Sequence, residues 1–175
     1  MRFSLQPFAS TPAPPIQIIG NIARNENQLN LEYLLTDNIK EVVIATPANN
    51  PTRKHKLWEE TCFEFFLGVK NSSRYWEFNL SPAGDWNVYR FDGYRQAMQE
   101  EVAFTTLPFR VEQREKSLAI ALDVDLNQIV PPESPLDVAI TAVLKHRDGE
   151  VTYWALTHQA SEADFHLRHS FILEL

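Results

Sequence analysis

Carboxylate, amide and aromatic side chains recur at every second position in two neighbouring segments of the chain, 62–67 and 75–80. Glu64 lies in the first segment, and Glu77 and Asn79 lie in the second. A two-residue period is typical of a β-strand that buries one face, so these three polar groups are expected to lie together on the face opposite the core. Groups of this kind can accept and donate hydrogen bonds to a small ligand that carries hydroxyl groups.

An indole precedes this polar face. Extending the strand period backwards from Glu64 places Trp58 and Glu60 on the same side, and an indole can pack its flat apolar surface against the C–H face of a sugar ring. The alternative interpretation is a solvated outer face, because an antiparallel sheet commonly buries only one side. The presence of Cys62 and Tyr75 among the acidic residues favours a groove in which rings and hydrogen-bonding groups meet.

A third segment, 86–91, also reads as a strand and has two possible orientations. Trp86 and Arg90 lie on one side of it, and alternation alone does not decide whether that side faces the groove. We favour this side, because an arginine within reach of Glu77 or Glu64 would be paired rather than isolated. Trp86 and Arg90 are therefore included among the candidate ligand-binding residues.

The C-terminal tail is the second place where polar groups concentrate, and its histidines raise the question of zinc. His166 and His169 are three residues apart, which on an extended chain places them on opposite faces. No cysteine or acidic spacing completes a tetrahedral set with them, so no metal site is predicted. Cys62 is the single cysteine of the chain, and we interpret it as a packed thiol rather than a nucleophile.

The charge of the chain argues against two classes of partner. Its 175 residues carry a formal net charge of −7 with no long run of lysine or arginine, which opposes binding to nucleic acid and to anionic membrane surfaces. The length suits a single domain, 1–175. The first residues lack the apolar region of a secretory signal, and no segment approaches the roughly twenty apolar residues that span a bilayer. We therefore expect a cytoplasmic protein.

Most of the remaining chain alternates in the same way and predicts further strands. These are expected at residues 2–8, 16–24, 29–35, 41–45, 109–114, 118–124, 136–145, 151–157 and 170–175. The other expected elements are a proline-rich linker at 9–15, a loop at 46–56, one helical turn or a loop at 96–101, and a short helix at 125–129. Many strands with few helical stretches predict an all-β, jelly-roll-like antiparallel sandwich.

The central stretch also resembles a known family. The runs WEETCFEFF, YWEFNLSP and DWNVYRFDGYR, together with WALTH and DFHLRH near the C-terminus, resemble the DOMON-like superfamily in its branch related to family-nine carbohydrate-binding modules. This resemblance implies a sandwich of two antiparallel sheets and a sugar site that contains Trp58, Glu64 and Asn79. It also implies that Phe165 or His166 replaces the second tryptophan that closes over the sugar in relatives.

These observations favour a non-catalytic module that binds a carbohydrate or a sugar-like polyol and needs no cofactor. Its candidate ligand-binding residues are Trp58, Glu60, Glu64, Glu77, Asn79, Trp86, Arg90, His158, Phe165 and His166. Two alternatives stay open. Glu64 and Glu77 could be the acid and base of a glycoside hydrolase, which needs carboxylates about 5 to 9 Å apart. Other DOMON relatives hold haem, which requires an axial histidine or methionine, and Met98 is the only internal methionine.

Overall fold

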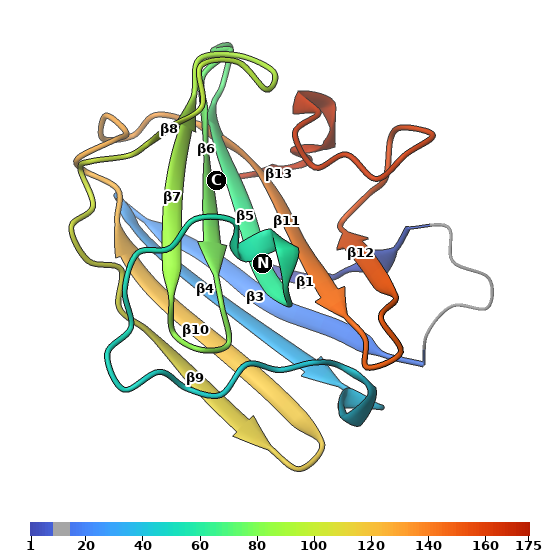
Figure 1. The fold of residues 1–175 in the computed structure, drawn as a ribbon. Coiled ribbons are helices and arrows are strands. Elements are labelled where there is room, and N and C mark those ends of the chain that lie inside the picture. The colour runs from blue at the N-terminus through green and yellow to red at the C-terminus, as the bar shows by residue number, and fades with distance from the viewer. Residues whose placement is uncertain (9–14) are drawn as a thin grey trace.

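The computed structural model describes residues 1–8 and 15–175, which form two antiparallel sheets packed face to face (Figure 1). The expected all-β sandwich is confirmed. The expected linker falls mainly on 9–14, which lie outside the described residues. Helical structure in the described part consists of three short 3-10 turns, η1 (Ile39–Glu41), η2 (Leu57–Glu59) and η3 (Arg168–Ser170). No helix in that part is long and apolar enough to cross a membrane.

The smaller sheet has five strands and is built around the long hairpin of β3 and β4. In spatial order its strands are β1 (Arg2–Ser4), β3 (Gln17–Asn25), β4 (Gln28–Thr36), β10 (Ser117–Asp125) and β9 (Phe109–Arg114). Burial alternates along β4 and β10 as their sequences predict. In the β4–β10 register Leu31 lies opposite Leu122 and Leu35 opposite Leu118, so the inward side chains form a continuous apolar surface.

The larger sheet contains the segments that carry the candidate site. Its strands are β2 (Gln6–Pro7), β12 (Val151–Ala155), β11 (Leu136–Lys145), β5 (Cys62–Val69), β6 (Tyr75–Leu80), β7 (Trp86–Phe91) and β8 (Gln99–Glu100), and β13 (Leu173–Glu174) pairs with β11. The central strands β5 and β6 are buried along almost their whole length. Both faces of this sheet are therefore covered, and polar groups on its outer face are removed from bulk water.

The core between the sheets holds the apolar rows that the alternation predicts. Phe65 of β5 stacks on Phe78 of β6 with ring centroids 4.4 Å apart. Tyr33 of β4 reaches across the core and donates a 2.6 Å hydrogen bond to the backbone carbonyl of Glu64. This bond satisfies a buried hydroxyl and fixes the middle of β5 against the smaller sheet.

The outer face of the larger sheet is covered by a second apolar cluster and by the C-terminal tail. The cluster consists of Phe66, Tyr75, Tyr89, Phe91, Ala139 and Phe171, with Trp58 and Phe165 packed against it. The tail is held down by Arg168, whose Nη2 donates to Asp137 of β11 at 3.1 Å. A Cβ at Gly68 would lie 2.5 Å from the guanidinium carbon of Arg168, so the glycine leaves the space that this contact requires.

Two expected strands take a different form. Residues 2–8 form two short strands, β1 in the smaller sheet and β2 in the larger one, instead of a single edge strand. Residues 41–45 form no strand, and Val42 makes only an isolated bridge to His146. Leu5 and Val42 are both buried in the core. The apolar pattern of these segments therefore reflects burial and does not require continuous strand pairing.

Other segments also differ from the prediction. The helix expected at 125–129 is absent: Asp125 ends β10 and 127–129 form a turn, in which Asp125 Oδ1 accepts a 2.9 Å hydrogen bond from the backbone amide of Asn127. Residues 96–101, expected to be a helical turn or a loop, contain β8. The closing strand expected at 170–175 is reduced to the two residues of β13. These short elements are set by tertiary contacts, which a local pattern does not contain.

Candidate ligand-binding site

A cavity of about 360 Å³ lies on the outer face of the larger sheet, between η2, the segment 91–98 and the C-terminal tail. Its lining residues are Trp58, Glu64, Glu77, Phe91, Arg95, Met98, Val143, Tyr153, Ala163, Phe165 and His166. The volume falls in the range of roughly 300–1,000 Å³ that is usual for small-molecule sites. Apolar rings around a few polar groups are also the usual composition of such sites.

Glu64 of β5 and Glu77 of β6 provide the acidic groups of this cavity. In the antiparallel register Glu64 lies opposite Asn79 and Glu77 lies opposite Phe66, so the two carboxylates are diagonal neighbours on one face. Glu64 and Glu77 are only 3% and 4% exposed. Asn79 Nδ2 donates a 2.8 Å hydrogen bond to Glu77 Oε1, which holds that carboxylate in place.

Glu64 has one oxygen without a hydrogen-bond partner in the part of the chain that the structure describes. Its Oε2 lies 3.5 Å from the hydroxyl of Thr141, whereas the buried Oε1 makes no hydrogen bond, and the Cys62 thiol beside the carboxyl group is only a weak donor. Burial, and then repulsion from Glu77, raises the pKa of Glu64 well above its usual value. A buried polar atom without a partner costs free energy, and a ligand that donates a hydrogen bond to Oε1 would recover it.

Glu77 is also shifted towards its neutral form. Burial raises the pKa of Glu77 to about 7, although the hydrogen bond from Asn79 and the charge of Arg95 act in the opposite direction. Two neighbouring acids with raised pKa values retain a proton close to neutral pH. A protonated carboxyl donates a hydrogen bond and a carboxylate accepts one, so the pair offers both functions to a ligand.

His166 connects this acidic pair to the C-terminal tail. The Tyr75 hydroxyl lies 2.9 Å from His166 Nδ1 and accepts a 3.2 Å hydrogen bond from the backbone amide of Arg95. Tyr75 and His166 thus share one hydrogen bond, and the other imidazole nitrogen, Nε2, lies 3.8 Å from Glu77 Oε2. Burial and then the charge of Arg95 lower the pKa of His166 to about 4, although the charge of Asp164 acts in the opposite direction.

Arg95 lies at the rim of the cavity and is held by the tail. Its Nη2 donates a 2.9 Å hydrogen bond to Asp164 Oδ1, and the Tyr94 hydroxyl donates to Oδ2 at 2.5 Å. Although burial opposes the shift, the hydrogen bonds from Tyr94, the His166 amide and Arg95 lower the pKa of Asp164. Asp164 is therefore ionised at neutral pH and neutralises the charge of Arg95.

Aromatic rings form two sides of the cavity. Trp58 packs edge-on against Tyr89 with ring centroids 5.7 Å apart, and Phe165 of the tail packs against Tyr153 of β12 at 6.1 Å. Trp58 lies in η2 rather than in an extension of β5, yet it faces the cavity that contains Glu64. The indole and the Phe165 ring thus approach the cavity from different elements.

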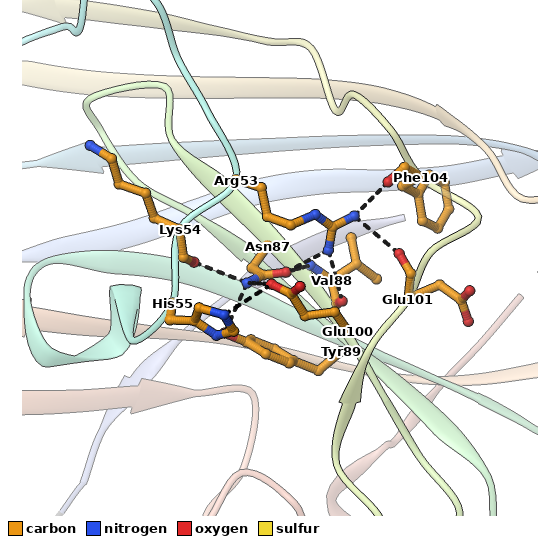
Figure 2. Close-up of polar contacts among 9 residues, drawn as sticks. All are labelled: Arg53, Lys54, His55, Asn87, Val88, Tyr89, Glu100, Glu101 and Phe104. Carbon is orange, nitrogen blue, oxygen red and sulfur yellow. Dashed lines mark hydrogen bonds and ion pairs between the residues drawn. The ribbon is translucent and has the colours of Figure 1, made fainter.

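The loop 46–56, which leads into η2, is fastened to β7 by Arg53 (Figure 2). The guanidinium carbon lies 4.3 Å from the centre of the Trp86 ring, and Nη1 donates a 2.7 Å hydrogen bond to Asn87 Oδ1. Nη2 donates to the backbone carbonyl of Glu101 at 3.0 Å. Because these bonds join the loop to β7 and to the residue that follows β8, they help to fix the point at which the chain enters η2 and Trp58.

The predicted site residues are only partly brought together. Those that line the cavity are Trp58, Glu64, Glu77, Phe165 and His166, and Asn79 supports Glu77 from the same face. Glu60 does not line the cavity, because it is exposed and pairs with Lys145 at 2.5 Å. His158 lies at the edge of the sheet, where its Nε2 is 2.9 Å from the backbone carbonyl of Gln6 and its ring packs on Phe8.

The expected orientation of β7 is wrong. Trp86 is buried in the core between the sheets, and Arg90 points to the same side, where its Nε lies 3.9 Å from Asp92. The opposite side of the strand, with Tyr89 and Phe91, packs in the outer cluster. Burying the large indole of Trp86 in the core gains more free energy than the ion pair that we expected for Arg90.

Several lining residues are absent from the predicted set. Arg95 and Met98 lie in the irregular segment between β7 and β8, which has no periodicity to indicate their direction. Val143 and Tyr153 are opposite each other in the β11–β12 hairpin and point outward. Their positions do follow from alternation, because Trp154, the neighbour of Tyr153, faces the core.

The residues of the cavity do not fit haem. Met98 and His166 both line it, but Nδ1 of His166 is bound to Tyr75 and Nε2 faces Glu77, so neither nitrogen is free to be an axial ligand. Within residues 1–8 and 15–175, no group of three or more His, Cys, Asp or Glu side chains is placed to hold a metal ion.

A larger hollow of about 790 Å³ lies on the outer face of the smaller sheet. Its charged side chains, including Arg2, Glu32 and Arg110, are exposed and therefore solvated. None of its lining residues has a buried polar atom without a partner in the described residues, whereas the smaller cavity is lined by Glu64, whose Oε1 is such an atom. We therefore take the cavity over Glu64 and Glu77 as the candidate site.

The fold and the cavity define a β-sandwich domain with a ligand-sized site on its larger sheet. No protein-family model matches the sequence, and no curated protein matches it. Among solved structures, the chain is similar to a candidate carbohydrate-binding protein from Bacteroides uniformis, with a TM-score of 0.71 and 14% identity over 97% of this chain and 84% of that chain.

The chain is also similar to a family 9 carbohydrate-binding module from Caldicellulosiruptor kristjanssonii. In the complex of that module with glucose, the TM-score is 0.52, with 9% identity over 86% of this chain and 72% of that chain. In its complex with cellotriose, the TM-score is 0.55, with 10% identity over 92% and 74% of the two chains. The chain therefore has the β-sandwich fold of family 9 carbohydrate-binding modules.

Proposed function

We propose that this chain is a small-ligand-binding module of the DOMON-like type, and that its ligand is a carbohydrate or a sugar-like polyol held in the cavity over Glu64 and Glu77. The observation that carries the proposal is that Glu64, which lines the cavity together with Trp58, has a buried Oε1 with no hydrogen-bond partner in the described residues. A sugar hydroxyl would supply the missing donor, while the indole would cover a C–H face of the ring.

The fold of the chain supports the same ligand class. Two of the similar structures are complexes of a carbohydrate-binding module with glucose and cellotriose. The net charge of −7 further supports a neutral or cationic small molecule over nucleic acid or an anionic membrane surface. A single domain and a cytoplasmic location complete the proposal.

Glycoside hydrolysis is the second candidate function. It is favoured by the adjacent carboxyl groups of Glu64 and Glu77, because a pKa of about 7 on Glu77 is suited to a general acid near neutral pH. Release of nitrophenol from a panel of nitrophenyl glycosides tests this candidate. Activity that disappears in Glu77→Gln would support it, and the absence of release from every glycoside would favour the binding module.

The binding proposal is tested with a panel of saccharides by thermal shift, using the wild type, Trp58→Ala and Glu64→Gln. Glu60→Gln is the matched control, because Glu60 is exposed near the same sheet but outside the cavity. We expect at least one saccharide at millimolar concentration to raise the melting temperature of the wild type and of Glu60→Gln. The same saccharide should leave the melting temperatures of Trp58→Ala and Glu64→Gln unchanged. A melting curve that no saccharide moves would contradict the proposal.

A further inference from the structure

In the part of the chain that the structure describes, no lysine or arginine is in direct contact with the acidic pair. Among the described residues, the only basic side chain within 4 Å of either carboxylate is His166, 3.8 Å from Glu77. Burial lowers the pKa of His166 to about 4, so that imidazole is a neutral neighbour. Arg95 at the rim lowers the pKa of Glu77 from a greater distance, and its own contact is with Asp164 at 2.9 Å rather than with either glutamate. A buried acidic pair without a basic partner is unfavourable unless protons or a ligand compensate it.

The walls around this pair are of the kind that attracts a cation. Trp58, Phe91, Tyr153 and Phe165 all line the cavity, and aromatic rings are attractive to ammonium groups. Neutral saccharides also pack on such rings, but they bring no charge to balance two buried acids. The combination of unbalanced carboxylates with aromatic walls therefore favours a positively charged ligand over a neutral one.

A metal ion is a poorer match than an organic cation. In the described ranges, no three His, Cys, Asp or Glu side chains converge, whereas hard cations such as Ca²⁺ need about six to eight oxygen ligands. An ammonium group needs only a few acceptors, and Glu64 Oε1 has no partner among the described residues. The cavity volume of about 360 Å³ leaves space for a ring attached to that ammonium.

We propose that the ligand of this cavity carries a protonated amine at Glu64 and Glu77, and that an amino sugar is therefore preferred over a neutral sugar. The sugar part of this inference rests on the proposed function, whereas the amine part rests on the two carboxylates. An ammonium N–H donates to Glu64 Oε1, and its charge stabilises the ionised form of both acids. The sugar ring packs between the indole of Trp58 and the ring of Phe165.

Proton release accompanies this mode of binding. The titratable and polar groups around Glu77 are Glu64 and Cys62 of β5, Asn79 and Tyr75 of β6, its cross-strand partner Tyr89 of β7, His166 of the tail and the more distant Arg95. Burial raises the pKa of Glu77 to about 7, so below neutral pH the free protein holds a proton there that a bound ammonium expels. Affinity for an amine should therefore rise as the pH approaches 7, and affinity for a neutral sugar should not.

The test is calorimetric titration with D-glucosamine, D-glucose, N-acetyl-D-glucosamine and choline at a pH of about 6, where an amine with the pKa of about 7.7–8.0 of an α-amino group is protonated. The two uncharged sugars match glucosamine in ring size, and choline presents a cation without a sugar. Each titration is repeated in two buffers of different ionisation enthalpy, because proton release makes the heat depend on the buffer. The proteins are the wild type, Glu64→Gln and Glu60→Gln.

We expect glucosamine to bind the wild type about tenfold more tightly than either uncharged sugar, since a charged hydrogen bond contributes more than about 1.4 kcal/mol in favourable cases. Binding should release a proton, and Glu64→Gln should remove the preference while Glu60→Gln keeps it. Circular dichroism of both variants verifies that the fold is intact.

The possible results separate the two proposals. Glucose binding as tightly as glucosamine would overturn the amine inference and leave saccharide binding in place. If choline binds and none of the three sugars does, recognition of an ammonium is supported and the carbohydrate function is contradicted. If none of the four compounds binds, the amine inference is overturned.

Discussion

Asn79 Nδ2 donates a 2.8 Å hydrogen bond to Glu77 Oε1. The two residues are two positions apart on β6, so their side chains share one face of the sheet, and both are buried. This bond holds Glu77 in the candidate cavity, but it does not compensate for its burial, which raises the pKa to about 7. Glu64, its diagonal neighbour on β5, has an oxygen without a partner among the described residues. Burial of this acidic pair therefore costs free energy, and a ligand that hydrogen-bonds to the pair can offset that cost.

Stability should fall with rising pH because of Glu77. The folded-state pKa is about 7 and the usual value is 4.5, so the contribution of this group is fully present below 4.5 and is lost as the pH rises through 7. The wild type should therefore lose about 3 kcal/mol of unfolding free energy between about pH 4 and about pH 8 that Glu77→Gln does not lose. Urea denaturation at both pH values measures this loss, and an unchanged difference would contradict the proposed burial of the acid.

His166 should act in the opposite direction. Its folded-state pKa is about 4 against a usual 6.5, so its contribution is fully present above 6.5 and is lost as the pH falls through 4. As the pH falls from 6.5 to 4, the free energy of unfolding of His166→Gln should decrease by about 3 kcal/mol less than that of the wild type. His158→Gln, outside the cavity, is the control. Equal acid sensitivity of the wild type and His166→Gln would show that the imidazole is not held neutral.

Trp58 and Trp86 should separate binding from stability. Trp86 is 5% exposed in the core, so Trp86→Ala is expected to reduce the free energy of unfolding by about 3–5 kcal/mol. Trp58 is only partly buried, and Trp58→Ala should cost about 1 kcal/mol while abolishing saccharide binding. Denaturation curves of both variants provide the comparison. The reverse order of the two losses would mean that Trp58 is a structural residue.

Arg53 should control the loop that leads to Trp58. Arg53→Ala removes the hydrogen bonds to Asn87 and Glu101, and we expect a loss of about 2 kcal/mol together with faster proteolysis within 46–56. Arg53→Lys keeps the charge but cannot make the forked set of bonds, so it should resemble Arg53→Ala. Limited proteolysis with mass spectrometry locates the cuts. Cleavage at the wild-type rate in both variants would contradict this role.

Alternation alone predicted the sandwich and the acidic face, because a strand turns successive side chains to opposite sides. It placed Glu64, Glu77 and Asn79 together, since all three lie in long strands with clear apolar rows. It could not orient β7, where an aromatic residue stands on each face. A possible ion pair of Arg90 favoured the wrong side of this strand, whereas burial of the Trp86 indole stabilises the fold more than that pair would.

The rest of the cavity depends on contacts between distant segments. Arg95 is positioned by Asp164, and His166 by Tyr75, and both pairs join the irregular tail to other parts of the chain. No local period determines how such segments fold back onto a sheet. The resemblance to carbohydrate-binding modules did indicate Phe165 and His166, whereas Arg95 and Met98 had no signal in the sequence.

The central claim, that the cavity beside Trp58 binds a saccharide, is tested most directly by the indole N–H signals in a proton–nitrogen NMR spectrum. The chain has four tryptophans, and among them only Trp58 lines the cavity, so Trp58→Phe identifies its signal. We predict that a bound saccharide or amino sugar shifts this signal and leaves those of Trp76, Trp86 and Trp154 in place. A Trp58 signal that stays unmoved throughout the saccharide panel would contradict the account.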